Sequence, residues 1–294
     1  MQQKIHILRS HIAAYYELTK PGVTFMVLIS AMVGYYLGLD APINMGHMAL
    51  TMLGIGLVAG GTSALNQVIE SNIDARMTRT RKRPIPTGRI SRLEGLVFGV
   101  SISVAGIGLL YAKINALTAL LAAATLLSYV FIYTPMKRKT TLSTLVGAVP
   151  GALPPVGGWA AARGDAGWHA WVLFGVLFFW QLPHFLAIAW LYKEDYARGG
   201  IRVLPLADPY GAKTIRQIIL NCVALLAISL LPTVFGWMGA VYAFGAAVLG
   251  LGYLYSGWLL ARTRTNRQAR QVLFASILYL PLLLALMTVH KLLA

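Results

Sequence analysis

The apolar residues of this chain gather in long blocks that short polar stretches separate. Nine blocks reach roughly 20 residues, the length that carries a helix across the hydrocarbon core of a bilayer. Their predicted bounds are 22–39, 47–69, 94–112, 114–134, 142–162, 168–192, 214–236, 238–261 and 270–290. The pattern predicts an all-α polytopic membrane protein, in which nine transmembrane helices form one bundle around a central chamber over residues 1–294.

The positions of the basic residues predict the orientation of the bundle. If the N-terminus is cytosolic, all but three of the 25 Lys and Arg residues lie on the inner side, the exceptions being Lys113, Arg163 and Lys291. Because positive residues are retained on the cytosolic side, we expect the C-terminus outside. Residues 1–20 contain neither the apolar core of a signal peptide nor an Arg- and Ser-rich transit segment. The expected location is therefore a bacterial inner membrane, with the first helix as the insertion signal.

Composition narrows the class of protein. Apolar residues make up 57% of the chain and charged residues 12%, and the net charge is +16. A nucleic-acid surface needs a folded basic face, whereas these basic residues lie between apolar spans, so no nucleic-acid partner is expected. The single cysteine, Cys222, excludes a disulfide within the chain and a Cys-based metal site.

The end of the second span carries three oxygen-bearing side chains at a spacing of four residues, namely Asn66, Glu70 and Asp74. On a helix this spacing places them on one face, over roughly 12 Å of rise. Two carboxylates one turn apart repel each other unless a cation lies between them. Mg²⁺ suits such a place because it accepts one or two carboxylates and completes its shell with water and substrate phosphate.

A basic run follows these acids and contains Arg76, Arg79, Arg81, Lys82 and Arg83. Its side chains suit phosphate through forked or point-charge contacts. Basic residues beside a membrane helix more often only fix topology, and taken alone the run favours that interpretation. The metal interpretation of Glu70 and Asp74 requires a second acidic cluster on the same side of the membrane.

That second cluster follows the sixth span. Glu194 and Asp195 are followed by Arg198 and Arg202, and four predicted helices separate this cluster from the first, which places both on one side. The two clusters predict a weak internal repeat of four-helix halves, about 20–139 and 140–261, followed by a ninth helix.

Two further stretches have two interpretations each. Tyr133, Lys137 and Arg138 after the fourth span are either a topology anchor or phosphate contacts. The fifth span contains VGAVPGALPPVGGW, whose prolines interrupt a helix. Irregular backbone at membrane depth is tolerated where it is buried in protein or lines a cavity, so this span is expected to border the chamber. Close packing of helices through small residues is the alternative.

His184 is the only histidine well inside a predicted span. It lies eleven residues before Asp195, so on a continuous helix the two side chains share a face. An ionisable group inside the membrane is a functional candidate, here as a ligand or a substrate contact. The alternative is that His184 hydrogen-bonds a carbonyl freed by Pro183.

Acidic patches ringed by basic residues at the mouth of an apolar chamber suit a substrate with a diphosphate head and a hydrocarbon tail. Three blocks carry a resemblance: NQVIESNIDARMTRTRKRPIPTGRI, YTPMKRKTTLSTLVGAVPGALPPVGGW and WQLPHFLAIAWLYKEDYARGGIRVLP, within residues 62–206. They resemble the UbiA-type intramembrane prenyltransferases and, among these, the protohaem IX farnesyltransferases. Nine spans agree with this resemblance along the whole chain.

The resemblance implies transfer of a farnesyl group from farnesyl diphosphate to a vinyl group of haem b, giving haem O, with Mg²⁺ as cofactor. It implies that Mg²⁺ and diphosphate are bound by Asn66, Glu70, Asp74 and Asp195. Substrate contacts are implied for Arg79, Arg83, Lys137, Arg138, Tyr133 and Arg198, while His184 would face haem. The implied surroundings are the lipid bilayer and, as a partner, a haem A synthase or an oxidase assembly factor. The rival interpretations are a UbiA-type enzyme with a quinone precursor or other tetrapyrrole as acceptor, and a transporter of an anionic lipid.

Overall fold

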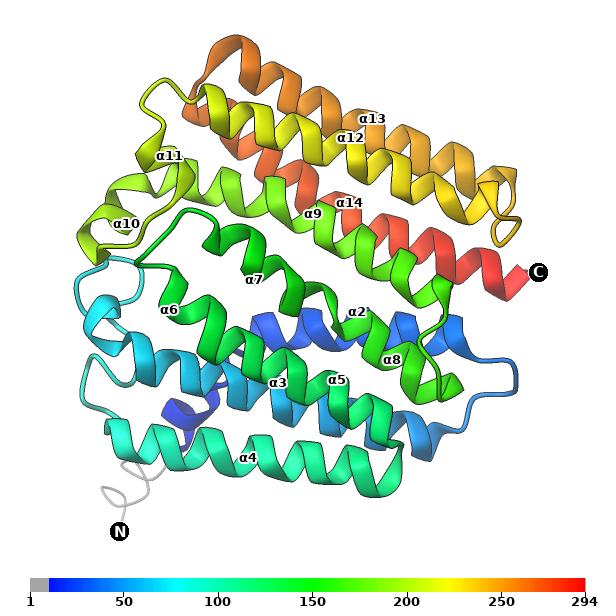
Figure 1. Ribbon diagram of the computed structural model, residues 1–294, viewed down its shortest axis with the longest axis horizontal. Coiled ribbons are helices and arrows are strands. Elements are labelled where there is room, and N and C mark those ends of the chain that lie inside the picture. The colour runs from blue at the N-terminus through cyan, green and yellow to red at the C-terminus, as the bar shows by residue number, and fades with distance from the viewer. Residues whose placement is uncertain (1–10, 294) are drawn as a thin grey trace.

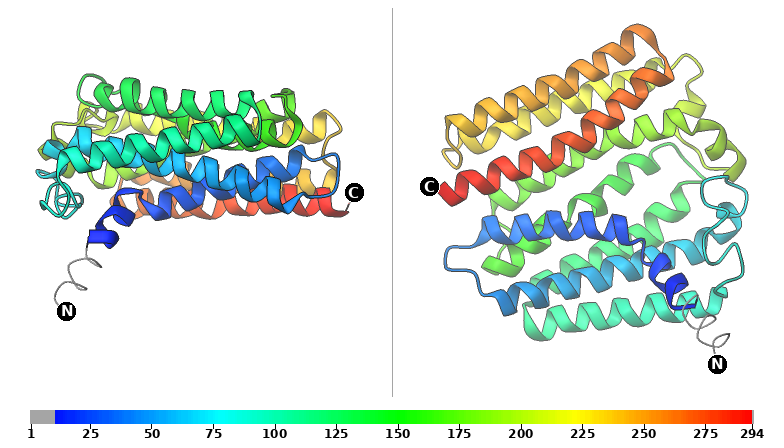
Figure 2. Two further views of the ribbon diagram at one scale, coloured as in Figure 1. Left: turned by 90° about the horizontal axis from the view of Figure 1, so that it is seen from below. Right: turned by 180° about the vertical axis from the view of Figure 1, so that it is seen from behind.

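The computed structural model describes residues 11–293, and all of its regular secondary structure in that range is helical. Within it, nine helical segments are long and apolar enough to cross a membrane, which confirms the predicted number. Their bounds are α2 Pro21–Gly38, α3 Met45–Asp74, α4 Arg92–Lys113, α5 to α6 Ala116–Met136, α7 to α8 Ser143–Arg163, α9 Trp168–Leu191, α12 Ala212–Val234, α13 Ala240–Thr263 and α14 Asn266–Leu293. They run roughly parallel to one another through the molecule (Figure 2).

Two of the nine spans are interrupted. The fourth consists of α5 (Ala116–Leu127), a π-helical turn η1 (Ser128–Tyr133) and the short α6 (Thr134–Met136). The fifth breaks at Leu153 into α7 (Ser143–Ala152) and α8 (Pro154–Arg163), as its prolines predict. Glycine allows the broken span to lie deep in the bundle, because a Cβ at Gly158 would lie only 1.8 Å from the carbonyl oxygen of Ala31 on α2.

The fifth span borders a small cavity, while its place beside the substrate chamber stays a prediction. A cavity of about 30 Å³ lies where α8 meets α3 and α5, and Pro154 and Gly157 contribute to its lining. The larger central chamber and the four-helix repeat stay predictions.

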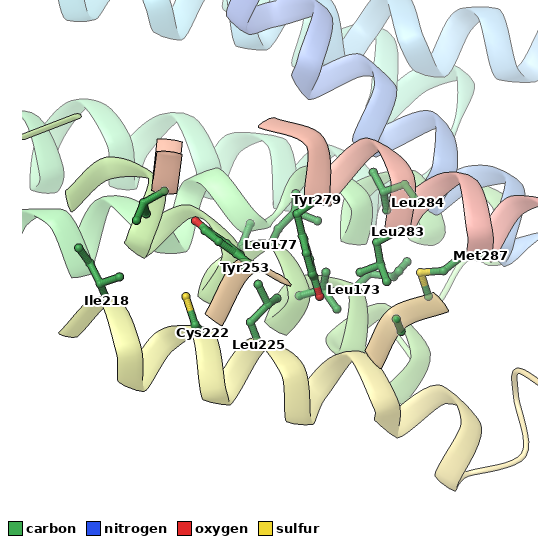
Figure 3. Packing of buried hydrophobic residues seen from close by; sticks show 14 of the residues in the cluster. Leu173, Leu177, Ile218, Cys222, Leu225, Tyr253, Tyr279, Leu283, Leu284 and Met287 are labelled. Carbon is green, nitrogen blue, oxygen red and sulfur yellow. The ribbon is translucent and has the colours of Figure 1, made fainter. Parts of the chain in front are cut away.

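The second half of the chain has a continuous apolar core. α9 packs against α12 and α14, and α13 closes the outer side of this group (Figure 1). Leu173 and Leu177 of α9 lie near Leu225 of α12 there, and Ile218 of α12 and Leu283 of α14 belong to the same buried cluster (Figure 3). This core fixes α9, whose C-terminal end leads into the second acidic cluster.

The connecting segments that carry the two acidic clusters meet at one end of the bundle, here called the site end. It includes α10 (Lys193–Gly199) and α11 (Leu204–Ala207), at the left of Figure 1. Met77, in the turn after α3, is buried with Ala189, Ile201 and Val203 from α9 and the segment after α10. Apolar burial therefore joins residues more than 100 positions apart and brings the clusters together.

Candidate active site

Asn66, Glu70 and Asp74 occupy the last turns of α3, which is unbroken up to Asp74. Their exposed fractions are 1%, 5% and 2%, so all three face the protein interior. The predicted shared face is therefore confirmed. Buried polar side chains at membrane depth require partners, and the structure supplies a cationic side chain for each of the three.

The partner of Asn66 is Lys20, the residue directly before α2. Lys20 Nζ donates a hydrogen bond of 2.9 Å to Asn66 Oδ1, while Asn66 Nδ2 donates to Thr134 Oγ1 at 3.2 Å. Burial, aided by the nearby cations Arg83 and Lys137, lowers the pKa of Lys20 to about 7. Lys20 also adopts a left-handed backbone conformation, with φ 48°.

The sequence analysis missed Lys20 as a site residue because it counted only as a topology charge. The available signal was a lysine directly before Pro21, at the start of a span. Proline fixes the first helical turn, so the preceding side chain is held close to the bundle.

The partner of Glu70 is Lys137. Its Nζ lies 2.8 Å from Glu70 Oε1, a close ion pair in which Oε1 lacks the geometry of a hydrogen bond. The same ammonium lies 4.4 Å from the centre of the Tyr133 ring. Burial alone would lower the pKa of Lys137, but Tyr133 and Glu70 hold it above its ordinary value.

The π-helical turn η1 positions Tyr133. A π-turn inserts an extra residue into the helix and reorients the side chains at its end, which is why such turns recur at functional sites. The ring of Tyr133 then lies against Gly147 of α7, where a Cβ would come within 2.4 Å of the ring. Tyr129, one turn earlier, packs edge-on against Tyr133 at 4.9 Å. The sequence predicted Tyr133 in the site but not the turn that places it.

The partner of Asp74 is Arg83, from the basic run. Arg83 Nη1 lies 2.7 Å from Asp74 Oδ2, and Thr80 Oγ1 donates to the backbone carbonyl of Asp74. The chain folds back after α3 so that Arg83 meets the acid nine residues before it. Ile85 and Ile90 secure this fold because they are buried against the helical residues 11–18 and α3.

Asp195 belongs to the same end of the bundle but has different partners. Its Oδ1 accepts a hydrogen bond of 2.7 Å from the Thr78 backbone N–H, and its Oδ2 accepts one of 3.3 Å from the Arg79 N–H. Arg198 Nη2 also donates to Oδ1, at 2.7 Å, and to Thr78 Oγ1. Burial alone would raise the pKa of Asp195, but these bonds lower it below its ordinary value. Asp195 therefore fastens the turn that follows Asp74.

Two other arginines that were predicted to contact substrate, Arg79 and Arg138, have exposed side chains. Arg79 is exposed, and its guanidinium lies 5.8 Å and 5.7 Å from the rings of Tyr192 and Tyr196. Arg138 is exposed and makes neither an ion pair nor a side-chain hydrogen bond with the described residues. Arg79 thus lies at the rim of the site, and a phosphate role for Arg138 stays a prediction.

The expectation that His184 and Asp195 share one helical face is wrong. The helix breaks at Tyr192, where φ is −114° and ψ is 23°, and Asp195 belongs to the separate helix α10. His184 instead turns toward α14, where its Nδ1 lies 2.7 Å from Ser276 Oγ. Because that hydroxyl donates to the Leu273 carbonyl, the arrangement favours the neutral tautomer with its hydrogen on Nδ1. His184 Nε2 then keeps its lone pair.

The oxygen donors of α3 fit Mg²⁺. Residues 11–293 contain no group of three or more His, Cys, Asp or Glu side chains close enough to hold a metal ion by themselves. Mg²⁺ does not require one, since it keeps several waters and takes one or two carboxylates plus substrate phosphate. Glu70 Oε1 is buried and receives no hydrogen bond from the described residues, although the Lys137 ammonium lies 2.8 Å away, and the Asp74 carboxylate lies one turn further along the helix. Asp195 is less available, because both of its oxygens already accept hydrogen bonds.

Comparison with known proteins decides the family. Residues 27–279 match the model of the UbiA prenyltransferase family. The chain belongs to that family. A protoheme IX farnesyltransferase of Solibacter usitatus is 48% identical over 94% of this chain and 98% of its own length. One from Koribacter versatilis is 43% identical over 94% and 93%.

Solved structures of UbiA-type proteins have the same fold. A digeranylgeranylglyceryl phosphate synthase superposes with a TM-score of 0.82 at 18% identity, covering 97% of this chain and 99% of that chain. A UbiA homologue from Archaeoglobus fulgidus, bound to GPP and Mg²⁺, gives 0.69 at 14% identity, covering 94% and 99%. The family match and the membrane-spanning helices together show that this UbiA chain is a multi-pass membrane prenyltransferase.

Proposed function

We propose that this UbiA chain transfers the farnesyl group of farnesyl diphosphate to a vinyl group of protohaem IX. The similarity to proteins named protoheme IX farnesyltransferase over nearly their whole length supports the acceptor. The single observation that supports the donor is the row of three buried oxygen donors on α3, each facing a cation. A diphosphate head is the ligand that such alternating charges suit.

Lys20, Arg83 and Lys137 are the cations that bind the diphosphate in this proposal. Each now contacts an oxygen of α3 from a different segment of the chain. When a diphosphate binds, these side chains have phosphate oxygens as further partners, and Arg offers a forked contact where Lys offers a point charge. Asn66, Glu70 and Asp74 would hold Mg²⁺, which neutralises diphosphate charge and so assists its departure.

The reaction proceeds by loss of diphosphate from the farnesyl C1 atom. The bond from C1 to the diphosphate oxygen breaks, and the electron pair leaves with the diphosphate that the cations hold. The vinyl group supplies the pair for the new carbon–carbon bond. Water then adds to the resulting cation and releases a proton, which leaves a hydroxyethylfarnesyl chain on the macrocycle. Burial of the site keeps water from the allylic carbon before the vinyl group reacts.

Tyr133 and Tyr129 lie beside the Lys137 ammonium, and in this proposal their rings face the positive charge that develops on the donor. The Tyr133 ring already holds a cation, Lys137, against its face at 4.4 Å. Aromatic faces attract positive charge through their quadrupole, so the tyrosine pair would stabilise the allylic cation as the diphosphate departs. His184, with Nε2 free to accept, is the proposed contact for the acceptor macrocycle.

The proposed orientation places the site end in the bacterial cytoplasm. The connections that carry Arg83, Lys137 and Arg198 all lie at that end, as the positive-inside rule requires of cytosolic loops. Physical association with a haem A synthase or an oxidase assembly factor remains part of the proposal.

Chromatography of haems extracted from membranes tests the proposal. Membranes that contain this chain, supplied with farnesyl diphosphate and haem b, should form a more hydrophobic haem that is missing from membranes without it. A purified chain that prenylates a quinone precursor but leaves haem b unchanged would overturn the proposed acceptor and keep the prenyl transfer. Movement of a prenyl lipid across vesicles without any product would overturn both.

A further inference from the structure

A groove runs along the seam between α13 and α14, and no residue of α3 or of the basic run lines it. Its volume is about 720 Å³, and both helices contribute to its lining. Tyr253 and Tyr279 are buried at its floor, with exposed fractions of 2% and 1%. Exposed apolar side chains, including Phe274 and Leu282, form its walls. The groove therefore has an apolar lining and opens to the side of the bundle that would face lipid.

One end of the groove is strongly basic. Arg267 and Arg270 line it in the first turns of α14, at the site end of the helix. Both are exposed, and neither makes an ion pair or a side-chain hydrogen bond with residues 11–293. The neighbouring arginines differ, because Arg264 donates to the Tyr210 carbonyl and Arg262 stacks on Trp258 at 4.6 Å. Two uncompensated positive charges thus mark the end of an apolar channel.

The length of the groove matches one leaflet. From Arg267 to Leu282 the lining of α14 covers fifteen residue steps, or roughly 22 Å of helix rise. Half of a hydrocarbon core of about 30 Å, together with the headgroup region, has a similar depth. We infer that this groove binds an anionic phospholipid of the leaflet at the site end, with its phosphate at Arg267 and Arg270 and an acyl chain along the tyrosine floor.

Charge complementarity and the lining favour a phospholipid over the other anionic amphiphiles near this enzyme. The lining contains no His, Cys or Met that would bind a haem iron through nitrogen or sulfur. It also contains no Asp or Glu, so it offers no carboxylate to a divalent ion that would accompany a diphosphate. Juxtamembrane arginines attract anionic headgroups, and an acyl chain fits a long apolar channel. The bound lipid would join α13 to α14 at the end of the chain.

Glycine offers a way to fill the groove without disturbing the fold. A Cβ added at Gly252, which lines the groove, meets no atom within 4 Å. The same holds for Gly108 on α4, an exposed glycine that does not line the groove. Gly252→Leu therefore blocks the channel, and Gly108→Leu is its matched control. A double variant, Arg267→Gln with Arg270→Gln, removes the positive charge at the basic end of the groove. Arg262→Gln is its control, because Arg262 lies at the same end of the bundle, in the last turn of α13.

The test is native mass spectrometry of the full chain, purified in detergent and offered equal amounts of phosphatidylglycerol and phosphatidylcholine. The wild-type chain should retain phosphatidylglycerol about tenfold better. The double arginine variant should lose that preference, and Gly252→Leu should lose retention of both lipids. Arg262→Gln and Gly108→Leu should behave as wild type, and prenyl transfer should persist in all of them.

Three results would overturn the inference. The first is equal retention of the two lipids by the wild-type chain. The second is that the Gly252→Leu variant retains as much phosphatidylglycerol as the wild-type chain. The third is stoichiometric displacement of the lipid by haem b or farnesyl diphosphate, which would assign the groove to a substrate instead. Because the readout is lipid retention, it stands apart from the outcome for the proposed reaction.

Discussion

The carboxylate of Asp195 accepts a hydrogen bond of 2.7 Å from the backbone N–H of Thr78, 117 positions earlier in the chain. This bond joins the two acidic motifs through the turn between them. Thr78 follows Asp74 by four residues, so fastening the turn also fixes the course of the chain from Asp74 to Arg83. We therefore propose that Asp195 is a positioning residue for the proposed diphosphate site.

Asp195→Asn should loosen this turn and lower activity. The neutral amide accepts at one oxygen only and loses the charge that Arg198 and the two N–H groups stabilise, about 1.5–3 kcal/mol per charged hydrogen bond. We expect KM for farnesyl diphosphate to rise at least tenfold and trypsin to cleave faster within residues 76–83. Asp208→Asn is the control, because Asp208 is a buried aspartate that accepts from the Thr214 N–H at the same end. Unchanged trypsin sensitivity in Asp195→Asn would refute the positioning role.

Glu70→Gln should destabilise the protein as well as inactivate it. The change leaves the Lys137 ammonium, 2.8 Å away, without its buried counter-charge. Removing one partner of a buried pair costs about 3–5 kcal/mol. The apparent melting temperature should fall in Glu70→Gln and should recover in the double variant that also carries Lys137→Met. Both variants should remain inactive. If the second substitution lowers the melting temperature further, the pair is not coupled as described.

Lys20→Met tests the site residue that only the structure revealed. Its Nζ lies 2.9 Å from Asn66 Oδ1 in a partly buried position, so its loss removes a proposed phosphate contact. The value of kcat/KM for farnesyl diphosphate should fall at least tenfold, or about 1.4 kcal/mol. Lys139→Met is the control, because Lys139 is an exposed lysine of the neighbouring connection. Equal effects of the two substitutions would mean that general surface charge, not the buried contact, matters.

Chelation of divalent ions should stop the release of diphosphate. The oxygen donors of α3 offer at most two carboxylates one turn apart, which suits an ion that needs substrate phosphate to complete its shell. EDTA should therefore abolish product formation, and added Mg²⁺ should restore it. EDTA preloaded with Mg²⁺ controls for effects of the chelator itself. Prenyl transfer that continues after all divalent metal is removed would end the proposed role of Glu70 and Asp74.

His184→Ala should separate the use of the acceptor from the use of the donor. The ring is held by Ser276 of α14, away from the cations that face α3. We expect KM for haem b to rise severalfold with little change in KM for farnesyl diphosphate. Ser276→Ala, which frees the ring without removing it, should show a smaller shift in the same direction. Equal losses for both substrates in His184→Ala would assign this residue to packing.

The sequence by itself determined the helical architecture and the α3 side of the candidate site. Apolar blocks of spanning length fix nine helices, because an unpaired backbone cannot cross lipid. The spacing of Asn66, Glu70 and Asp74 fixed their common face, since one uninterrupted helix carries all three. Local periodicity is enough for such statements, as both depend only on residues that are neighbours in the chain.

Tertiary structure decided which partners these residues meet. Lys20, Arg83 and Lys137 reach α3 from three separate segments, and the spacing within one helix cannot encode that meeting. Because α9 ends before Tyr192, Asp195 belongs to the separate helix α10. The prediction that Asp195 and His184 share one helical face was therefore wrong. Side-chain packing at the site end determines both, because burial of Met77 and its neighbours outweighs what any single segment prefers.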